Sequence, residues 1–531
     1  MALDMVGNRT LRDLLDERVE RNGDKAFIVY ENRDGDVSEL SYAQFQARVD
    51  GLASGLWNLG VRPGDRVTVF LANCPEILET WFALATIGAA MVPSNIANTV
   101  SELGYVLDFS GSVAVVTEPR FLDVVGPAAD GVPAVRHRIL VRSAEAVPGT
   151  ISIDELRAST TVRPAIDVDP ESVVQMLFTS GTTSRPKAVL LTHANALHGG
   201  QRESTGLAMD STDRAITSLP VFHVNAQVIT VLSTLSVGGT CILLEEYRAT
   251  KFWDQVRRHR ATQVSIVAMQ ARTLLAQPER ETDSQHVVRR TFYALNISVE
   301  EKDRFEKRFA VELINAYGLS ETMTLVTIAP VFGPKRWPSI GLPSAGRVVR
   351  LVGDDGQDVA LGEPGEIVVA GVPGRTIMKG YHNDPEATAK AIRDGWLYTG
   401  DSAFADEFGY LYWFDRSVDV IKRAGENIST LEVEGVLTEH PAVAEAAVIG
   451  IPDPIRDQAV KAVVVLVDGA TASADELTEF CAKRLSKFKV PTEYEFRDSL
   501  PKTSIGKVSK GVLRSESESE SAPAPAPVFG S

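Results

Sequence analysis

The sequence predicts an α/β protein with a large N-terminal domain and a small C-terminal domain, and three observations support this prediction. The chain has 531 residues, which is too many for a single hydrophobic core. Between residues 10 and 120, helical and strand patterns alternate, as expected for α/β subdomains with largely parallel sheets. From residue 341 to residue 413, short apolar runs alternate with glycine-rich turns, which predicts a small β-barrel subdomain within the N-terminal domain.

The individual segments support these assignments in order. We expect an amphipathic helix in LRDLLDERVERNGD, a buried strand in GDRVTVFLAN, and a helix that opens with proline in PEILETWFALATIGAAMVPSN. Strands joined by tight turns are expected in RVVRLVGDDGQDVALGEPGEIVVAG. After Asp415, helical and strand patterns mix, which indicates a separate α+β domain. Residues 515–531 contain almost no residues that form a core, so we expect this tail to be disordered.

Composition and charge exclude several classes of protein. The formal net charge of −16 argues against a nucleic-acid-binding protein, because phosphate contacts need clustered Lys and Arg. Cys74, Cys241 and Cys481 are far apart, so we expect buried thiols in a reducing compartment rather than a disulfide framework or a zinc ribbon. The N-terminus lacks the apolar core of a signal peptide, and the longest apolar run is shorter than the ~20 residues of a membrane span. We therefore expect a cytoplasmic protein without a transmembrane segment.

A loop rich in glycine and hydroxyl residues occurs in LFTSGTTSRPKAVLLTHAN, which begins at Leu177. It is not a Walker A loop, because Pro186 and Ala188 stand where that motif needs a glycine and a Mg²⁺-binding hydroxyl. Hydroxyls, close backbone approach and a lysine nevertheless suit phosphates. A surface turn rich in Ser and Thr is the alternative. The candidate phosphate ligands are Thr179, Ser180, Gly181, Thr182, Thr183 and Lys187.

Four further segments give this loop a context. They are NAYGLSET from Asn315, GWLYTGD ending at Asp401, GYLYWFDRSVDVIKRAGENIS, and PKTSIGKVSK with Lys507. Each has an ordinary explanation by itself, such as a solvated carboxylate or a chain end. Together, and in this order, the five motifs resemble the adenylate-forming superfamily of acyl-CoA synthetases, carrier-protein adenylation domains and luciferases over nearly the whole chain. The segments LFTSGTTSRPK, KRWPSIG, IKRAGEN and IRDQAVKAVVVL are most similar to the crotonobetaine/carnitine–CoA ligase type.

The resemblance implies an ATP- and Mg²⁺-dependent carboxylic acid–CoA ligase. In such enzymes a carboxylate attacks the α-phosphate of ATP, giving an acyl-adenylate and pyrophosphate, and the thiol of coenzyme A then displaces AMP. One alternative keeps the adenylation but hands the acyl group to a carrier protein, an amine or nitrite. Another is a non-catalytic nucleotide-binding homologue, although retention of Glu321, Asp401, Arg416 and Lys507 argues against it. The expected partners are a small carboxylic acid and coenzyme A or a carrier protein, and a homodimer is compatible with the sequence.

The resemblance also implies roles for individual residues. The loop from Thr179 to Thr183, with Lys187, would bind the β- and γ-phosphates, and Glu321 would bind the Mg²⁺ that bridges phosphate oxygens. Lys507 would stabilise the charge that develops between the carboxylate and the α-phosphate. The other implied nucleotide contacts are Thr322 at the α-phosphate, Asn315 and Tyr317 at the adenine, Asp401 and Arg416 at the ribose, and, more loosely, Ala294–Asn296 at the adenine. The implied catalytic residues are Thr182, Lys187, Glu321, Lys422 and Lys507.

A hinge at residues 415–418 is also implied, between an N-terminal domain of residues 1–414 and a mobile C-terminal domain of residues 419–514. The C-terminal domain would rotate after adenylation, which would remove Lys507 and open a tunnel for the thiol. Val418 stands where the family commonly has Asp or Lys, but rotation about the backbone needs no charge. The implied tunnel residues are Lys422, Gly425, Glu426 and Asn427.

The acyl group is expected near SLPVFHVNAQ, where the family's histidine borders the acyl channel. This segment has no aspartate to hold an ammonium group, so an α-amino acid is not the expected substrate. Asn225 stands where the carnitine-ligase pattern has an acid, which argues against a betaine. Met269, Met323 and Leu325 favour a medium-length or aromatic acid, although core packing explains them equally well, and His223 also has an alternative as a core residue. The implied pocket residues are Phe222, His223, Val224, Asn225, Gly318 and Leu319.

Overall fold

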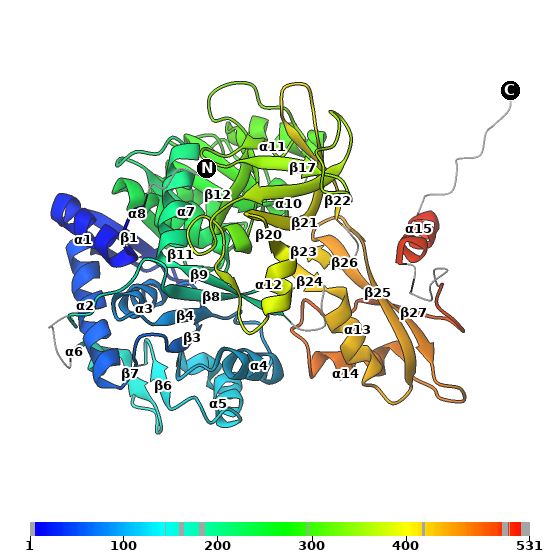
Figure 1. The fold of residues 1–531 in the computed structure, drawn as a ribbon, viewed down its shortest axis with the longest axis horizontal. Coiled ribbons are helices and arrows are strands. Elements are labelled where there is room, and N and C mark those ends of the chain that lie inside the picture. The colour runs from blue at the N-terminus through cyan, green and yellow to red at the C-terminus, as the bar shows by residue number, and fades with distance from the viewer. Residues whose placement is uncertain are drawn as a thin grey trace. The chain divides into compact units, whose positions relative to one another are not determined.

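The computed structural model describes residues 6–143, 145–158, 164–179, 186–294, 297–416, 420–501, 508 and 510–521. The chain forms two compact units (Figure 1), of which one comprises Met1–Thr179 and Lys187–Arg416 and the other contains Ser417–Ser531. The division follows Arg416 and therefore falls in the segment for which we expect a hinge. The hinge itself stays a prediction.

The first unit contains an eight-stranded sheet in the order β19-β9-β8-β4-β3-β5-β6-β7. Neighbouring strands from β8 to β7 in this order are parallel, whereas β9 is antiparallel to both β8 and β19. The strands are β3 (Arg66–Phe70), β4 (Ala90–Pro93), β5 (Ala114–Thr117), β6 (His137–Leu140), β7 (Ile151–Ser152), β8 (Val173–Thr179), β9 (Lys187–Thr192) and β19 (Gly380–Tyr381). Helices in this part of the chain are α2 (Tyr42–Asn58), α3 (Pro75–Thr86), α4 (Val100–Ser110), α5 (Leu122–Asp130) and α6 (Ile153–Ala158), with a 3₁₀ turn η1 (Pro119–Phe121). Side chains of α2 and α3 share one apolar cluster with this sheet, and those of α4 and α5 share another.

A second, nine-stranded sheet of the first unit has the order β16-β15-β14-β13-β12-β10-β11-β1-β2. It is parallel from β14 to β1 in this order, and its outer pairs are antiparallel. The strands are β1 (Ala26–Glu31), β2 (Val37–Ser41), β10 (Arg214–Thr217), β11 (Thr240–Leu244), β12 (Gln263–Val267), β13 (Arg290–Ala294), β14 (Leu313–Leu319), β15 (Thr324–Ile328) and β16 (Leu342–Pro343). The helices are α1 (Leu11–Asn22), α7 (His193–Gly206), α8 (Ser233–Val237), α9 (Phe252–Arg258), α10 (Ala268–Leu275) and α11 (Val299–Phe309), with a π-helical turn η2 (Ala226–Leu232) and a 3₁₀ turn η3 (Ser320–Thr322).

Aromatic packing links the second sheet to the helices of the first. The ring of Phe27, on β1, stacks on Tyr42 at 4.6 Å and meets Phe45 edge-on at 5.2 Å between ring centroids. Phe45 in turn meets Phe82 of α3 at 5.5 Å. All four side chains are fully buried, so α2 and α3 lie in a continuous apolar core that fixes the two sheets to each other.

A third sheet of the first unit is antiparallel, with the order β17-β18-β21-β20 and with β22 paired to β21. It occupies the segment for which we expected a small β-barrel subdomain. Its strands are β17 (Val349–Val352), β18 (Gly365–Ala370), β20 (Ile392–Arg393), β21 (Trp396–Ala405) and β22 (Leu411–Arg416), and α12 (Pro385–Ala391) precedes β20. Together with the two larger sheets, it confirms an α/β N-terminal part.

The second unit is an α+β domain, as predicted, built on a five-stranded sheet in the order β24-β23-β26-β25 with β27 paired to β26. Its apolar core includes Ile421, Val448, Val460 and Leu477. The strands are β23 (Val420–Arg423), β24 (Glu426–Ser429), β25 (Val443–Asp453), β26 (Asp457–Leu466) and β27 (Glu493–Phe496), and the helices are α13 (Thr430–Thr438), α14 (Ala474–Ala482) and α15 (Lys510–Ser521).

Helix α15 corrects one expectation from composition, because it extends into the tail that we expected to be disordered from residue 515. Leu513 is fully buried in the second unit. Farther along the helix, Glu516 forms an ion pair with Arg497 at 2.7 Å, and Lys461 Nζ donates to Ser517 Oγ at 2.9 Å. The polar helix is therefore held by polar contacts, which composition alone does not reveal. Residues 522–531 lie outside the described residues.

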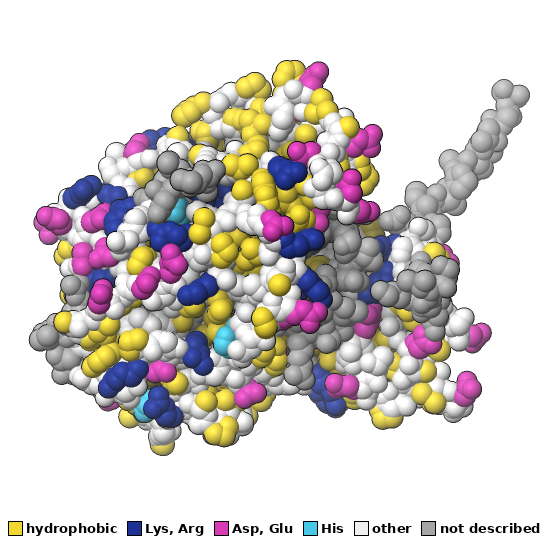
Figure 2. All heavy atoms as spheres, viewed as in Figure 1, with side chains coloured by type: hydrophobic (Ala, Val, Ile, Leu, Met, Phe, Trp, Pro, Cys, Tyr) yellow, Lys and Arg dark blue, Asp and Glu magenta, His cyan; other side chains and the backbone are white. Residues whose placement is uncertain are grey.

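Surface and thiols agree with the composition. Charged side chains of both signs are scattered over the face of the first unit in Figure 2. In the described part of the chain, no helix is long and apolar enough to cross a membrane. Cys74, Cys241 and Cys481 are free thiols, and all three are buried as expected.

Candidate active site

The expected phosphate loop joins two antiparallel strands of the first sheet. β8 ends at Thr179 and β9 begins at Lys187, and these two residues are paired in register. Their backbones therefore stand side by side at the base of the loop. The other predicted loop residues, Ser180, Gly181, Thr182 and Thr183, lie outside the described residues.

Tyr381 brings Lys187 and Glu321 together, although sequence reasoning did not single it out. Its hydroxyl donates a hydrogen bond to Glu321 Oε1 at 2.9 Å. The ammonium nitrogen of Lys187 lies 5.0 Å from the centroid of the Tyr381 ring, within the range of a cation–π interaction. Burial, together with the nearby Glu321 carboxylate, raises the pKa of Tyr381, so its hydroxyl stays protonated and acts as a donor. The GY pair in MKGYHNDPEATAK is the only sequence signal for this residue.

The turn that carries Glu321 and Thr322 is held by several backbone contacts. The N–H of Met378 donates to the Glu321 carbonyl at 2.6 Å, and Thr322 Oγ1 donates to the Leu319 carbonyl at 2.9 Å. The buried Arg347 donates to the Thr322 carbonyl at 2.9 Å and to the Thr376 carbonyl at 2.7 Å. These hydrogen bonds fix the backbone of the turn, and this restricts where the Glu321 carboxylate can lie.

One carboxylate at this place fits a Mg²⁺ site. Mg²⁺ usually binds to proteins through one or two carboxylates and takes its remaining ligands from substrate phosphates and water. Glu321 would supply the carboxylate, and Lys187 would supply a positive charge for phosphate oxygens that the metal does not neutralise. Glu321 and Lys187 lie at the same end of the candidate site, because both contact Tyr381.

The predicted nucleoside contacts Tyr317 and Asp401 are neighbours. The Tyr317 hydroxyl donates to Asp401 Oδ2 at 2.7 Å, and Asp401 is fully buried. The ring of Tyr317 also meets Trp413 edge-on at 5.5 Å between centroids. Asn315, two residues earlier on β14, is turned to the backbone and donates to the Ser339 carbonyl at 2.7 Å. Ser339 belongs to the KRWPSIG segment, so two of the quoted motifs meet here.

Two predicted nucleotide contacts are only partly described. Asp401 is paired in register with Arg416 in the β21–β22 ladder, but the Arg416 side chain lies outside the described atoms. Ala294 ends β13, which is parallel to β14, while residues 295 and 296 lie outside the described residues.

The expected acyl segment follows β10, and the buried side-chain amide of Asn73 holds its backbone in place. Asn73 donates to the Leu219 carbonyl at 2.9 Å and accepts from the Val221 N–H at 2.9 Å. The rings of Phe222 and His223 are in contact, with centroids 4.6 Å apart, and both side chains are only partly buried. Partial burial of His223 argues against the alternative of a core position.

Asn225 is held in one orientation by β12. Its Oδ1 accepts a hydrogen bond from the Ser265 hydroxyl at 2.9 Å. Gly318 and Leu319 end β14, and Met269 lies in the first turn of α10. The residue that replaces the acid of the carnitine-ligase pattern is thus a neutral amide engaged with a neutral hydroxyl.

The predicted tunnel residues lie on the β23–β24 hairpin of the second unit. Lys422 is paired with Asn427, and Arg423 with Glu426, while the turn residues Ala424 and Gly425 both have positive φ (53° and 90°). The N–H of Lys422 donates to Gln458 Oε1 at 2.8 Å. Gly425 suits this turn because the left-handed region costs glycine little. Lys507 and Val418 lie outside the described residues.

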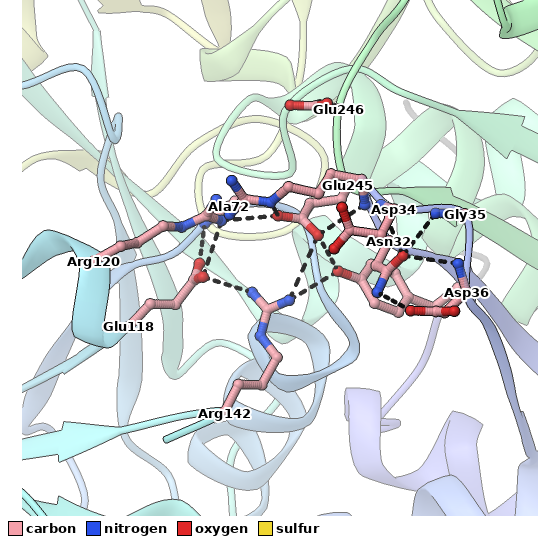
Figure 3. A network of polar contacts seen from close by, with 12 residues as sticks. Asn32, Asp34, Gly35, Asp36, Ala72, Glu118, Arg120, Arg142, Glu245 and Glu246 are labelled. Atoms are coloured by element: carbon pink, nitrogen blue, oxygen red, sulfur yellow. Dashed lines mark hydrogen bonds and ion pairs between the residues drawn. The ribbon is translucent and has the colours of Figure 1, made fainter. Parts of the chain in front are cut away.

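A network of charged residues at the ends of four strands, in which Glu118 and Glu245 are buried, was also missed by sequence reasoning (Figure 3). Arg142, after β6, pairs with Glu118 after β5 at 2.9 Å and donates to the Tyr30 hydroxyl at 2.8 Å. Tyr30, on β1, donates to Glu245 after β11 at 2.9 Å, and Arg120 bridges Glu245 and Glu118 at 3.0 and 2.9 Å. Burial raises the pKa of Glu118 and the facing Arg142 opposes this effect. The network joins the two large sheets.

Comparisons with known proteins place these features in a family. The family model for AMP-binding enzymes matches residues 15–382, and the model for the AMP-binding enzyme C-terminal domain matches residues 432–507. A crotonobetaine/carnitine–CoA ligase of Salmonella paratyphi B is 39% identical over 521 residues, which cover 96% of this chain and 100% of that ligase.

Solved structures agree with this placement. A double mutant of o-succinylbenzoate CoA synthetase from Bacillus subtilis, bound with a product analogue, aligns with a TM-score of 0.83 at 27% identity, covering 94% of this chain and 98% of that one. An amide bond synthetase from Marinactinospora thermotolerans aligns with the same TM-score and identity, covering 94% and 99%. The chain therefore belongs to the family of AMP-binding enzymes.

Proposed function

We propose that this protein is an AMP-forming carboxylic acid–CoA ligase that uses ATP and Mg²⁺. A carboxylate oxygen of the acid attacks the α-phosphorus of ATP, the bond to pyrophosphate breaks, and an acyl-adenylate forms. The sulfur of coenzyme A then attacks the acyl carbon, the thiol loses its proton, and AMP leaves. The observation that carries the proposal is that Lys187 and Glu321, far apart in sequence, meet at one residue, Tyr381, in a chain that also buries the Tyr317–Asp401 pair.

The charged residues of the proposed site would each bind one part of the Mg²⁺–ATP complex. Bound Mg²⁺ would neutralise phosphate charge, which lets two anions approach each other. Glu321 would hold the metal and Lys187 would bind the departing pyrophosphate, while Asp401, oriented by Tyr317, would accept hydrogen bonds from ribose hydroxyls. The proposed roles of Thr179–Thr183, Asn315, Thr322, Arg416 and Lys507 complete the nucleotide site.

The order of the two half-reactions calls for movement of the C-terminal domain. We propose that residues 415–418 are the hinge, that Lys507 acts in adenylation, and that the hairpin with Lys422, Gly425, Glu426 and Asn427 acts in thioester formation. The turn at Gly425 supports this assignment, because a backbone without a side chain at this point lets pantetheine pass closely.

The proposed acid is apolar and of medium length, or aromatic. A quaternary ammonium group binds best to an acid or an aromatic cage. Asn225 offers neither, because its amide is bound to Ser265. A betaine substrate, as in the name of the Salmonella relative, is therefore not proposed for this chain.

The test is pyrophosphate release with ATP and Mg²⁺ over a panel of acids, each measured with and without coenzyme A. The panel contains betaines, medium-chain acids and substituted benzoic and cinnamic acids, and products are identified by mass. We expect an apolar acid to give its CoA thioester only with coenzyme A present. Acid-dependent pyrophosphate release without any CoA thioester would contradict the proposed acceptor and point to a carrier protein, an amine or nitrite.

Two further points concern the location and the oligomeric state of the protein. We propose a cytoplasmic location, because the three cysteines are unpaired and buried. A homodimer stays a prediction that size-exclusion chromatography with light scattering would decide.

A further inference from the structure

Tyr381 is the residue at which the two charged groups of the phosphate end meet. Its hydroxyl binds Glu321 Oε1 at 2.9 Å and its ring faces the Lys187 ammonium, 5.0 Å from the ring centroid. One side chain thus contacts both the proposed metal ligand and the proposed phosphate ligand, through two different interactions.

The backbone around Tyr381 is bonded to the elements that carry these two groups. In β19, Tyr381 is paired with Val189 of β9, the strand that begins with Lys187. The N–H of His382 donates to the Ala188 carbonyl at 2.8 Å, and the N–H of Met378 donates to the Glu321 carbonyl at 2.6 Å. The segment from Met378 to His382 therefore connects the strand of Lys187 with the turn of Glu321.

Local packing leaves Tyr381 little freedom to move. Its N–H donates to Thr388 Oγ1 at 2.9 Å, which ties β19 to α12. The preceding Gly380 has φ of 150°, and a Cβ at this position would lie 2.9 Å from Thr388 Cγ2. Close approach of α12 is thus possible only because residue 380 is glycine, and this approach fixes the backbone from which the Tyr381 ring projects.

We propose that Tyr381 is a positioning residue that holds Glu321 and Lys187 in place for the Mg²⁺–ATP complex, an inference that rests on the proposed function. The Tyr381 hydroxyl restricts the Glu321 carboxylate to one orientation. The Tyr381 ring keeps the Lys187 ammonium over its face. Side chains that hydrogen-bond to metal ligands typically change metal affinity by about 10–100-fold when they are replaced. Tyr381 thus affects the reaction through its neighbours and does not contact the reacting atoms.

Two substitutions separate the two interactions. Tyr381→Phe removes the hydroxyl and keeps the ring, so it tests the contact with Glu321 alone. Tyr381→Leu removes the ring as well, so it also tests the contact with Lys187. Tyr412→Phe is the matched control, because the Tyr412 hydroxyl also donates to a carboxylate, Asp406, at 3.1 Å but lies outside the proposed site.

The measurement is calorimetric binding of ATP over a series of Mg²⁺ concentrations and in EDTA, with melting temperatures recorded for every variant. For Tyr381→Phe we expect the Mg²⁺ concentration that gives half-maximal tight ATP binding to rise about 10–100-fold. At high Mg²⁺ the affinity for ATP should return to that of the wild type, and the affinity for metal-free ATP should be unchanged. For Tyr381→Leu we expect metal-free ATP to bind more weakly as well. Tyr412→Phe should match the wild type.

Two results would overturn the inference. One is a Tyr381→Phe variant with the Mg²⁺ dependence of the wild type, and the other is an equal loss for metal-free and Mg²⁺-bound ATP accompanied by a lower melting temperature. Failure of the proposed function would look different, because then the wild type itself would neither bind ATP nor release pyrophosphate.

Discussion

At the scale of single residues, the site combines groups with opposite requirements. Asp401 is fully buried and is bound by the Tyr317 hydroxyl, whereas Lys187 is only partly buried and faces an aromatic ring. A buried carboxylate with a donor beside it is preorganised for hydroxyl groups, and a partly exposed ammonium suits a phosphate that must leave. In the proposed site, Asp401 would bind the ribose of ATP and Lys187 would bind its departing pyrophosphate.

Glu203 gives a residue-scale prediction for pH dependence. It is fully buried on α7, neither carboxylate oxygen has a hydrogen-bond partner among the described residues, and burial raises its pKa from 4.5 to about 8. Between pH 4.5 and pH 8 the unfolded chain loses this proton while the folded chain keeps it, so stability falls as pH rises through this window. Glu203→Gln should remove this loss, and at pH 8 it should be more stable than the wild type by ~2–4 kcal/mol.

Thermal unfolding across pH 5–8 checks this prediction, with Glu386→Gln as the control, since Glu386 is an exposed residue paired with Lys390. The wild type and the control should show the same downward slope of melting temperature with pH, and Glu203→Gln should be flatter. An unchanged slope in Glu203→Gln would show that Glu203 is ionised or solvated in the folded protein.

At the scale of elements, the described residues proposed to bind phosphates and Mg²⁺ lie at or just after the ends of strands. The phosphate loop could be predicted because hydroxyl residues directly follow an apolar run, as Thr179 follows the apolar part of β8. The proposed role of Glu321, in contrast, came from the resemblance of NAYGLSET to the family motif. Tyr381 was not predictable, because its partners Lys187 and Glu321 lie far away in the sequence and a GY pair carries no chemistry by itself. The charge network could not be predicted for the same reason, because Glu118, Arg142 and Glu245 are far apart in the sequence and only folding brings them together.

The network in Figure 3 gives an element-scale prediction. Arg142→Met should leave Glu118 and Glu245 without one cation at the junction of the two sheets. We expect a loss of about 2 kcal/mol, below the ~3–5 kcal/mol for fully buried pairs, because the Arg142 side chain is 28% exposed. Adding Glu118→Gln should recover part of the lost stability, because the carboxylate that faced Arg142 is then replaced by a neutral amide.

Urea denaturation followed by tryptophan fluorescence measures this loss. The control is Arg138→Met, which breaks the surface pair with the 70% exposed Asp130 and should cost less than ~1 kcal/mol. If Arg142→Met and Arg138→Met are equally stable, the network contributes no more than a surface ion pair and does not fix the two sheets to each other.

At the scale of the whole molecule, the proposed reaction requires two units that act in turn. The fold of each unit was predictable from alternating patterns and turns, whereas the extension of α15 was not, because Glu516 and Ser517 are held by Arg497 and Lys461 of the same unit. The roles of Lys507 and of residues 415–418 are proposals that only kinetics can test.

Lys507→Ala provides the kinetic test. Adenylation should fall by at least about 100-fold, because a charge aimed at the transition state is lost, while ATP still binds. The second half-reaction, from synthetic acyl-adenylate and coenzyme A, should stay close to the wild-type rate. Lys483→Ala is the control, because Lys483 is an exposed lysine of the same unit, paired with Glu479. Equal losses in both half-reactions would contradict a role confined to adenylation.

The most direct test of an acyl-adenylate route is the transfer of oxygen from the acid. The acid that turns over is labelled with ¹⁸O in both carboxylate oxygens, and AMP and the thioester are analysed by mass spectrometry after reaction with ATP, Mg²⁺ and coenzyme A. An acyl-adenylate route predicts one ¹⁸O in AMP and one in the acyl-CoA, because the carboxylate oxygen that attacks the α-phosphorus leaves with AMP. Unlabelled AMP, or ADP with the label in inorganic phosphate, would contradict it.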